Sequence, residues 1–218
     1  MRIILVMIEI KPAQVWPLLL AAVAGLFLSG WLARSGVLIL GEEHLLTWIY
    51  GMPEELRLTF LVLTLLGSTW VLAVILIGLL IKSRFDIALR VMLAGLAAAS
   101  AAALAKELVG RPRPVLLLTE ILQRELLVSG NGFPSGHVAL ATAVSMVLGA
   151  YLPKKRRYIV PIWIGVVAVS RLYLGVHAPL DIVGGFCIGL IAAICVLLVF
   201  PPHKMVRGIR VAKKHKRA

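Results

Sequence analysis

The sequence has few of the residues that build disulfide frameworks or metal sites. Its 218 residues include only two cysteines, Cys187 and Cys195, both in the last apolar run. On a helix they would lie about 12 Å apart along the axis, because each residue rises about 1.5 Å, and that separation exceeds the reach of a disulfide. The chain also lacks an H-E-x-x-H motif and a set of cysteine ligands. These absences argue against a disulfide scaffold and against a zinc site.

Charged residues are scarce as well, since they make up 15% of a chain that is 61% hydrophobic. The mean hydropathy is +0.98, far above that of a soluble domain. A helix needs roughly 20 apolar residues to span a bilayer, and six runs reach or approach that length: 15–38, 58–81, 87–106, 135–152, 158–176 and 180–200. The sequence therefore predicts an all-α integral membrane protein with six transmembrane helices.

No low-complexity linker, second domain or internal repeat interrupts this pattern. We expect residues 1–218 to form one membrane domain, with its core over residues 15–200 and a basic cytoplasmic tail over residues 203–218. The opening residues 1–10 are apolar and have no small-residue cleavage pattern, so they predict an interfacial segment rather than a cleavable signal peptide. Gly185 and Gly189 form a G-x-x-x-G pattern, which we expect to serve packing within the bundle.

Acidic residues are the minority, with 10 of them against 23 lysines and arginines and a net charge of +13. The basic residues gather near the N-terminus, around residues 82–90, at residues 154–157 and in the tail, and these are alternate connections of a six-span chain. The loops at 39–57 and 107–134 carry most of the acids. The positive-inside rule therefore predicts cytoplasmic termini and places these two loops outside. A basic chain can also bind nucleic acid, but contact of the tail with anionic lipids explains its charge better.

The outer loop between the third and fourth predicted spans has an amphipathic pattern. Within residues 115–130, apolar residues recur at helical spacing and polar residues lie between them. This pattern is typical of a short helix lying at the membrane interface. Such a helix would cover the top of the bundle or form a platform for a lipid tail, and the two roles are compatible.

Three stretches at the edges of the predicted spans, 106–114, 134–137 and 170–181, hold ionisable side chains. Charges in or beside a membrane span are costly, so they indicate a functional site. His177 and Asp181 lie four residues apart and would share one face of a helix start. The carboxylate would then orient the imidazole and leave its other nitrogen as a nucleophile or base. A structural polar pair or half of a metal site has the same spacing, but the surrounding cations favour an anion over a metal ion.

The remaining ionisable side chains suit a phosphate ligand. Arg171 has a planar fork for bidentate phosphate contact. Lys106 and Arg113 flank a helix-to-loop transition and can converge on the same anion, whereas Arg111 is a weaker candidate that would contact headgroups or face water. At residues 134–137, the sequence PSGH places an N-cap serine before a helix whose N–H groups attract phosphate. Gly136 would let the backbone approach a ligand, and His137 could act as a general acid.

Together, the three stretches resemble the signature of the phosphatidic acid phosphatase type 2 superfamily, which includes lipid phosphatases and the vanadium haloperoxidases. That signature reads K-x6-R-P, P-S-G-H and S-R-x5-H-x3-D, and this chain fills each position: Lys106, Arg113, Pro114, Pro134, Ser135, Gly136, His137, Ser170, Arg171, His177 and Asp181. The resemblance implies that His177 attacks phosphorus and forms a phosphohistidine, that Asp181 orients it, and that His137 protonates the leaving group.

The resemblance also implies how the phosphate is held and what it belongs to. Its oxygens would contact Lys106, Arg113, Ser135, Gly136 and Arg171, with Pro114, Pro134 and Ser170 in supporting positions. No metal or other cofactor would be needed. The implied partners are membrane lipids and a lipid phosphate substrate, with no nucleic acid, at the extracytoplasmic face of the plasma (inner) membrane of a prokaryote.

A polyprenyl diphosphate similar to undecaprenyl diphosphate is the favoured substrate. Phosphatidylglycerol phosphate, phosphatidic acid and a lipid A phosphate are alternatives. A phosphotransferase with a lipid hydroxyl as acceptor, and an anion or lipid transporter, are alternative functions. Discontinuous spans or internal two-fold symmetry would support a transporter. The sequence gives no prediction of the oligomeric state.

Overall fold

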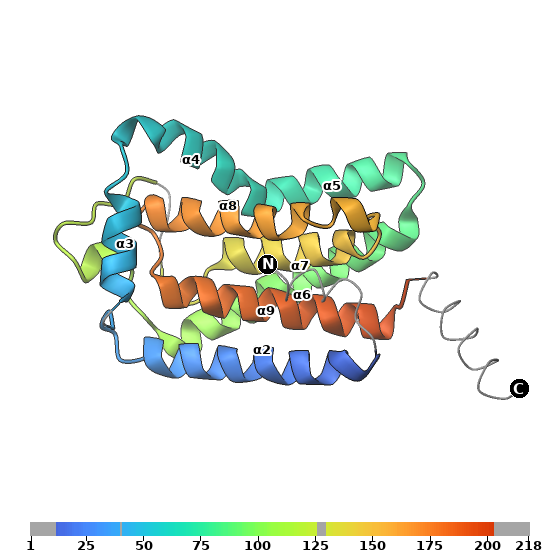
Figure 1. Ribbon diagram of the computed structural model, residues 1–218, viewed down its shortest axis with the longest axis horizontal. Helices are drawn as coiled ribbons and strands as arrows, with labels where there is room; N and C mark the ends of the chain where they lie inside the picture. The colour runs from blue at the N-terminus through green and yellow to red at the C-terminus, as the bar shows by residue number, and fades with distance from the viewer. Residues whose placement is uncertain (1–11, 40, 126–129, 203–218) are drawn as a thin grey trace, which may run out of the picture.

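The computed structural model describes residues 12–39, 41–125 and 130–202. These residues form helices and loops, and no β-strand occurs among them. Most of the helices run along the long axis of the molecule, and α3 (Glu42–Tyr50) lies across one end (Figure 1). The prediction of an all-α protein is therefore confirmed. The predicted interfacial segment at residues 1–10 and the basic tail at 203–218 lie outside the described residues.

Each of the six predicted apolar runs forms helix. The segments are α2 (Pro12–Ala33), α4 (Arg57–Thr64) with α5 (Thr69–Ile81), α6 (Phe85–Val109), α7 (Gly136–Gly149), α8 (Ile159–Tyr173) and α9 (Pro179–Val199). Three of the helices, α2, α6 and α9, are long and apolar enough to cross a membrane, and α4 with α5 would make a fourth. With 14 and 15 residues, α7 and α8 are about 21 and 23 Å long, shorter than the roughly 30 Å of a bilayer core. The count of six spans stays a prediction.

The second segment is bent by 54° between α4 and α5. A 3-10 turn, Leu65–Gly67, separates the two helices. A Cβ on Gly67 would lie 2.8 Å from the His137 carbonyl oxygen and 2.7 Å from a methyl group of Val167. The indole N–H of Trp163 donates to the Leu66 carbonyl at 2.9 Å. The bend therefore lies where the segment packs directly on α7 and α8, next to the first turn of α7.

The centre of the bundle is α7, whose residues are buried on nearly every side. It packs most extensively against α9. A Cβ added to Gly185 or Gly189 would collide with the carbonyl oxygens of Ser135 and Ala139. The G-x-x-x-G pattern therefore lets α9 approach the backbone of α7, as small residues do between membrane helices. This packing lies within the chain, as predicted.

The outer loops differ from the prediction. The predicted amphipathic helix within 115–130 is wrong for the described part of this loop, where only a 3-10 turn at Pro114–Leu116 is helical. Arg124 explains the difference, because its backbone N–H donates to the Leu174 carbonyl at 3.0 Å. Its guanidinium also donates to the carbonyls of Tyr50 and Tyr173 at 2.9 and 3.0 Å. These contacts bond the loop to α3 and α8 instead of to its own preceding turn. Residues 126–129 of the predicted helix lie outside the described residues.

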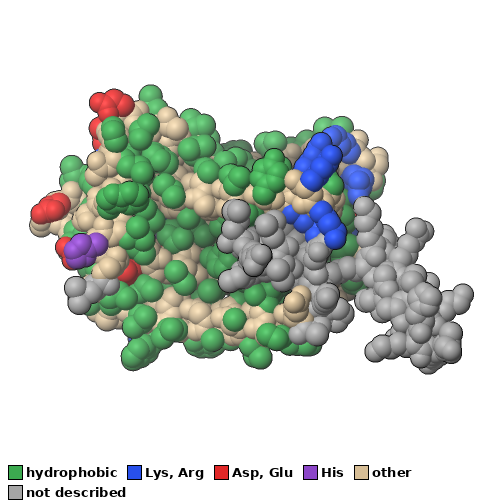
Figure 2. Space-filling view, in the orientation of Figure 1, with side chains coloured by type: hydrophobic (Ala, Val, Ile, Leu, Met, Phe, Trp, Pro, Cys, Tyr) green, Lys and Arg blue, Asp and Glu red, His purple; other side chains and the backbone are tan. Residues whose placement is uncertain are grey.

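The amphipathic helix at this end of the molecule is α3 instead, in the loop at 39–57 where no helix was predicted. Its Leu46 and Ile49 are buried, whereas Trp48 is exposed. Acidic side chains gather at the end of the molecule where α3 lies, and lysines and arginines gather at the opposite end (Figure 2). The exposed cations there belong to the α5–α6 and α7–α8 connections, residues 82–84 and 154–156. The two ends of the bundle thus differ in charge as the sequence predicts.

Candidate active site

The three polar stretches meet at the end of the bundle that α3 covers (Figure 1). Lys106 lies in the last turn of α6 and Arg171 in the last turn of α8. Ser135 immediately precedes α7, and Asp181 lies in the first turn of α9. Consecutive helices of the bundle alternate in direction, so these four helix ends lie on the same side.

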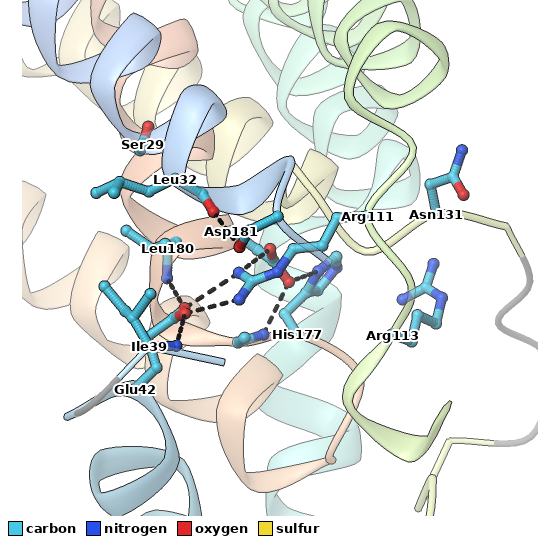
Figure 3. Close-up of polar contacts among 12 residues, drawn as sticks. Ser29, Leu32, Ile39, Glu42, Arg111, Arg113, Asn131, His177, Leu180 and Asp181 are labelled. Carbon is cyan, nitrogen blue, oxygen red and sulfur yellow. Dashed lines mark hydrogen bonds and ion pairs between the residues drawn. The ribbon is translucent and has the colours of Figure 1, made fainter. Parts of the chain in front are cut away.

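His177 and Asp181 form a close pair in the turn that begins α9 (Figure 3). Nδ1 of His177 lies 3.4 Å from Oδ2 of Asp181, and the backbone N–H of Ala178 donates to the same oxygen at 2.8 Å. The two residues are 2% and 0% exposed. The pair therefore shares a capping turn rather than the helix face that its spacing predicts. The carboxylate faces one ring nitrogen, and Nε2 has no carboxylate partner among the described residues.

The imidazole of His177 is held in its neutral form. Burial holds its pKa well below the usual value of 6.5, and the positive charges of Arg171, Lys106 and Arg113 lower the pKa further. A hydrogen bond with the backbone of Gly132 acts in the opposite direction. At physiological pH the ring is therefore neutral, and a neutral imidazole has a lone pair available for nucleophilic attack.

Lys106 is bonded to the loop that precedes α7. Its Nζ donates to the Asn131 carbonyl at 2.6 Å, and the Asn131 side-chain amide donates back to the Lys106 carbonyl at 3.0 Å. This reciprocal pair connects the end of α6 to the loop. It fixes the direction in which the ammonium group points.

Arg113 connects the same loop to the turn before α9. Its Nε donates to the Gly130 carbonyl at 2.9 Å, and a terminal nitrogen donates to the Val176 carbonyl at 2.8 Å. Arg113 is 6% exposed. These hydrogen bonds to backbone carbonyls hold the guanidinium in place, and its positive charge acts on His177.

Arg171 is the deepest of the three cations and is 1% exposed. One terminal nitrogen donates to Thr64 Oγ1 at 2.8 Å and to Glu125 Oε2 at 2.6 Å. A buried guanidinium is costly without a partner, and Glu125 offsets that cost. Lys106, Arg113 and Arg171 all act electrostatically on both His137 and His177. The two imidazoles therefore lie in one common field of three cations from separate parts of the chain.

The PSGH stretch presents a helix N-terminus to this field. Ser135 occupies the N-cap position of α7, as predicted, but its side chain makes no cap hydrogen bond. Its Oγ is fully buried and has no partner among the described residues. A Cβ added to Gly136 would meet nothing within 4 Å. The first turn of α7 therefore has open space beside Gly136, a buried hydroxyl and the N–H groups that helix starts offer to anions.

Arg111 does not face water or headgroups, and that prediction is wrong. Its side chain is 0% exposed and forms ion pairs with Glu42 at 2.6 Å and Asp181 at 3.1 Å. Two carboxylates neutralise the charge, which is why the side chain can be buried. Glu42 belongs to the acidic residues of the loop at 39–57, yet it is 5% exposed and lies inside the site.

The supporting residues of the signature have structural contacts. Ser170 is fully buried, and its hydroxyl donates to the Val167 carbonyl of its own helix at 2.7 Å. Pro114 is the first residue of the 3-10 turn Pro114–Leu116, which follows α6 in the chain. Pro134 follows Phe133 through a cis peptide bond and lies against Gly184 of α9. In the described part of the chain, no group of three or more His, Cys, Asp or Glu side chains could hold a metal ion.

Residues 86–204 match the family model of the PAP2 superfamily, and this range includes every signature residue described above. The chain belongs to the PAP2 superfamily. The matched range also includes the cluster of cations and imidazoles at one end of the bundle.

The PAP2 chain is similar to curated relatives over part of their length. Sphingosine-1-phosphate phosphatase 2 of Mus musculus is 32% identical over 114 residues, which is 48% of this chain and 30% of that protein. Phosphatidylglycerophosphatase B of Bacillus subtilis is 42% identical over 73 residues, which is 29% of this chain and 36% of that protein. The matched region thus spans about a third of each relative.

Two solved structures share the PAP2 fold over most of their length. Aquifex aeolicus LpxE superposes with a TM-score of 0.66 and 29% identity, covering 71% of this chain and 93% of that one. A transmembrane PAP2 type phosphatidylglycerolphosphate phosphatase from Bacillus subtilis superposes with a TM-score of 0.63 and 24% identity, covering 79% and 92%. The similarity to the Bacillus subtilis structure shows a shared fold and nothing further.

Sequence reasoning missed four side chains that hold the site: Glu42, Thr64, Glu125 and Asn131. Thr64 and Glu125 lie 107 and 46 residues from Arg171, which they contact, so no local pattern relates them to it. Asn131 lies in the Asn-Gly turn just before PSGH. Its polar amide beside the signature was the one feature of the sequence that could have indicated a role in the site. Glu42 counted only as one of the acids of the loop at 39–57, because nothing in the sequence distinguishes it from Glu43.

Proposed function

We propose that this PAP2 protein is an integral membrane enzyme that hydrolyses a lipid phosphate or diphosphate through a phosphohistidine on His177. The observation that carries the proposal is the buried, neutral imidazole of His177, paired with Asp181 and surrounded by three cations. Phosphoryl transfer depends mostly on positioning and on charge stabilisation. This site offers both around one nucleophile.

The phosphate would bind between the cations and the start of α7. Lys106, Arg113 and Arg171 would contact its non-bridging oxygens, where negative charge accumulates in the transition state. The hydroxyl of Ser135 and the N–H groups beside Gly136 would donate to the same oxygens. The open space at Gly136 and the unpartnered Ser135 Oγ support this placement. These donors would supply the charge that a magnesium ion supplies in other phosphoryl transfers.

The reaction would proceed in two displacements. His137 takes up a proton when the phosphate anion binds and offsets the charge of the three cations. His177 then attacks phosphorus, a P–N bond forms, and the P–O bond to the lipid breaks while His137 gives that proton to the leaving oxygen. A water molecule then gives a proton to His137 and attacks phosphorus, which breaks the P–N bond and releases inorganic phosphate. Asp181 holds the Nδ1 proton of His177 and stabilises the ring as positive charge develops on it. No step requires a metal or other cofactor.

We propose six spans with both termini in the cytoplasm and the site on the extracytoplasmic side of a prokaryotic inner membrane. The helix formed by every predicted apolar run and the basic end of the bundle support this topology. A site at the outer helix ends would meet a lipid headgroup at the depth of the interface.

The substrate class rests on the relatives. A polyprenyl diphosphate similar to undecaprenyl diphosphate stays a candidate. The names of the relatives give phosphatidylglycerol phosphate and sphingosine 1-phosphate as further candidates, and both are lipid phosphate monoesters. Phosphatidic acid and a lipid A phosphate complete the panel that a test should include.

The transporter alternative gains one feature from the structure, because α4 and α5 form a broken span. The break, however, is filled by the close packing of Gly67 on His137 and Val167. Buried charged residues in the described chain lie near the helix ends rather than along the depth of the bundle. A hydrolytic site therefore explains the arrangement better than an anion pathway.

The proposal is tested by phosphate release from the lipid panel, with purified full-length protein and a chelator present. We expect release from at least one lipid, inhibition by vanadate, and complete loss in His177→Ala. His44→Ala is the matched control, since His44 is an exposed histidine of α3, and it should keep full activity. Equal rates for His177→Ala and the natural chain, or full dependence on added divalent metal, would contradict the proposal. Transfer to a second lipid without free phosphate would indicate a phosphotransferase.

A further inference from the structure

A buried ion network connects the His177–Asp181 pair to Arg111 and Glu42 (Figure 3). Arg111 lies at its centre. One terminal nitrogen of Arg111 donates to Asp181 Oδ1 and to Glu42 Oε1, both at 3.1 Å. The other donates to Glu42 Oε2 at 2.6 Å and to the Val37 carbonyl at 3.1 Å. The Glu42 carboxylate and the Val37 carbonyl thus hold the planar guanidinium in one orientation. In that orientation it also donates to Asp181.

Glu42 is the fixed end of this network. Besides Arg111, its carboxylate accepts the Leu180 N–H at 2.8 Å and the Ile39 N–H at 3.3 Å. Leu180 is the residue before Asp181 in the first turn of α9. Glu42 therefore bonds the start of α3, the loop before it and the start of α9, and it sets where Arg111 lies relative to Asp181.

The contacts of Asp181 divide between its two oxygens. Oδ1 accepts from Arg111, whereas Oδ2 accepts from Ala178 and faces Nδ1 of His177. With Oδ1 taken by the guanidinium, rotation of the carboxylate is prevented and Oδ2 stays directed at the imidazole. An isolated buried carboxylate is costly in its ionised form, and the adjacent Arg111 offsets that cost. The same contact therefore fixes the orientation of Asp181 and favours its charged form.

We propose that Arg111 and Glu42 are positioning residues for the nucleophile, acting on His177 through Asp181. The inference rests on the proposed function, in which His177 attacks phosphorus. The chain of contacts runs from Glu42 to Arg111, then to Asp181, then to His177, and only the last residue touches the substrate. Arg111 thus differs in role from Arg113, two residues later, whose contacts lie on the phosphate-binding side.

A purely structural role for the network predicts different behaviour. If Glu42 and Arg111 only attached α3 to the bundle, their loss would lower the unfolding temperature and leave the His177 ring unchanged in the folded protein. A positioning role predicts a slower chemical step and an altered ring at unchanged substrate affinity. The two roles are therefore separable by kinetics and by the state of the imidazole.

The test compares Arg111→Gln and Glu42→Gln with Glu43→Gln, which alters an exposed carboxylate of the same helix. We expect Arg111→Gln to slow phosphorylation of His177 roughly 10- to 100-fold in single-turnover assays, with KM nearly unchanged, as for other residues that orient a reactive group through one intermediate. Glu42→Gln should show a smaller loss and add little in the Arg111→Gln background, because both act through one carboxylate. Glu43→Gln should match the natural chain.

A second measurement reports the tautomer of the His177 ring directly. With 15N-labelled histidine, the natural chain should show His177 as the single tautomer with the proton on Nδ1, identified by its absence in His177→Ala. Arg111→Gln and Glu42→Gln should show a mixture of tautomers. Glu42→Gln retains one acceptor oxygen, which can still accept the Leu180 N–H, so it tests the inference even if Arg111→Gln does not fold.

The outcomes separate the inference from the proposed function. An unchanged phosphorylation rate and an unchanged ring in the folded variants would overturn the inference and leave the phosphatase intact. Hydrolysis of no lipid by the natural chain would overturn the proposed function. The ring signal does not depend on turnover, so in that case a tautomer mixture in Glu42→Gln would still support the positioning contacts, and an unchanged ring would refute them.

Discussion

The reactivity of single residues in this PAP2 protein follows from how ionisable groups are paired once they are buried. His177 is kept neutral by burial and by three nearby cations. Arg111 is kept charged by two carboxylates at 3.1 Å or less. The same region of the protein therefore holds a neutral imidazole and permanent cations side by side, a combination that suits the phosphoryl transfer we propose.

The neutral state of His177 predicts how the site responds to pH. A free imidazole is largely protonated at pH 6, but the lowered pKa of His177 should keep its ring neutral there. The charged groups that act on it are Lys106, Arg113 and Arg171, with Asp181 paired to Nδ1. The measurement is the 15N signal of the His177 ring from pH 8 to pH 5 in the protein without substrate. A midpoint at or above pH 6.5 would contradict this prediction.

The lowered pKa of His177 also makes the free energy of unfolding depend on pH. On unfolding, the ring regains its usual pKa and takes up a proton below about pH 6.5, whereas the folded ring does not. The contribution of His177 to the free energy of unfolding is therefore fully present above that pH and is lost as the pH falls. His177→Gln should weaken the pH dependence of thermal unfolding below pH 6.5.

Sequence reasoning could identify the signature residues but not the side chains that pair with Arg111 behind them. The signature residues are close together in sequence within three stretches, so their pattern was readable. The partners of Arg111 lie 69 and 70 residues away, and such long-range pairing leaves no local pattern. Arg111 was therefore predicted to contact headgroups or face water, because a cation without a visible partner is expected to be exposed.

Among the structural elements, the contact of α7 with α9 positions the site, since PSGH begins one helix and Asp181 lies at the start of the other. The Ser135 N–H donates to the Asp181 carbonyl at 2.9 Å. Gly185 and Gly189 allow the two backbones to approach this closely. The register of α9 on α7 therefore determines how far His177 lies from the first turn of α7.

This packing predicts opposite effects of two similar substitutions. In Gly189→Ala, the added methyl group would collide with the backbone of α7, and overpacking of this kind costs about 1–3 kcal/mol. In Gly165→Ala, the methyl group would meet nothing within 4 Å on α8, and alanine in place of glycine favours a helix by about 0.5–1 kcal/mol. Thermal unfolding in detergent measures both. Equal unfolding temperatures for the two variants would show that α9 does not pack on α7 in this register.

The success of prediction at this scale depended on the length of each element. Long apolar runs identified all six helical segments, because burial in lipid leaves the backbone no alternative to a helix. The helix α3 has nine residues and a mixed composition, so its hydrophobic periodicity was too short to read. The loop over 115–130 had helical spacing, but Arg124 bonds it to α3 and α8 instead. Tertiary contacts therefore determine the conformation of both short segments.

For the whole molecule, the separation of charge between the two ends sets the expected orientation. Exposed cations lie at the end formed by the α5–α6 and α7–α8 connections, and acidic side chains lie with the candidate site at the other end (Figure 2). Lysine and arginine in short loops are retained in the cytoplasm. The site is therefore expected to face outward.

Two exposed serines test this orientation without altering the charge of the chain. Ser35 lies between α2 and α3 at the end of the site, and Ser83 lies between α5 and α6 at the basic end. In a background with Cys187→Ala and Cys195→Ala, a membrane-impermeant maleimide added to intact cells should label Ser35→Cys. It should label Ser83→Cys only after the cells are permeabilised. The reverse labelling pattern would place the site in the cytoplasm. The basic connections would then lie outside, against the positive-inside rule, and only lipid phosphates of the inner leaflet could reach His177.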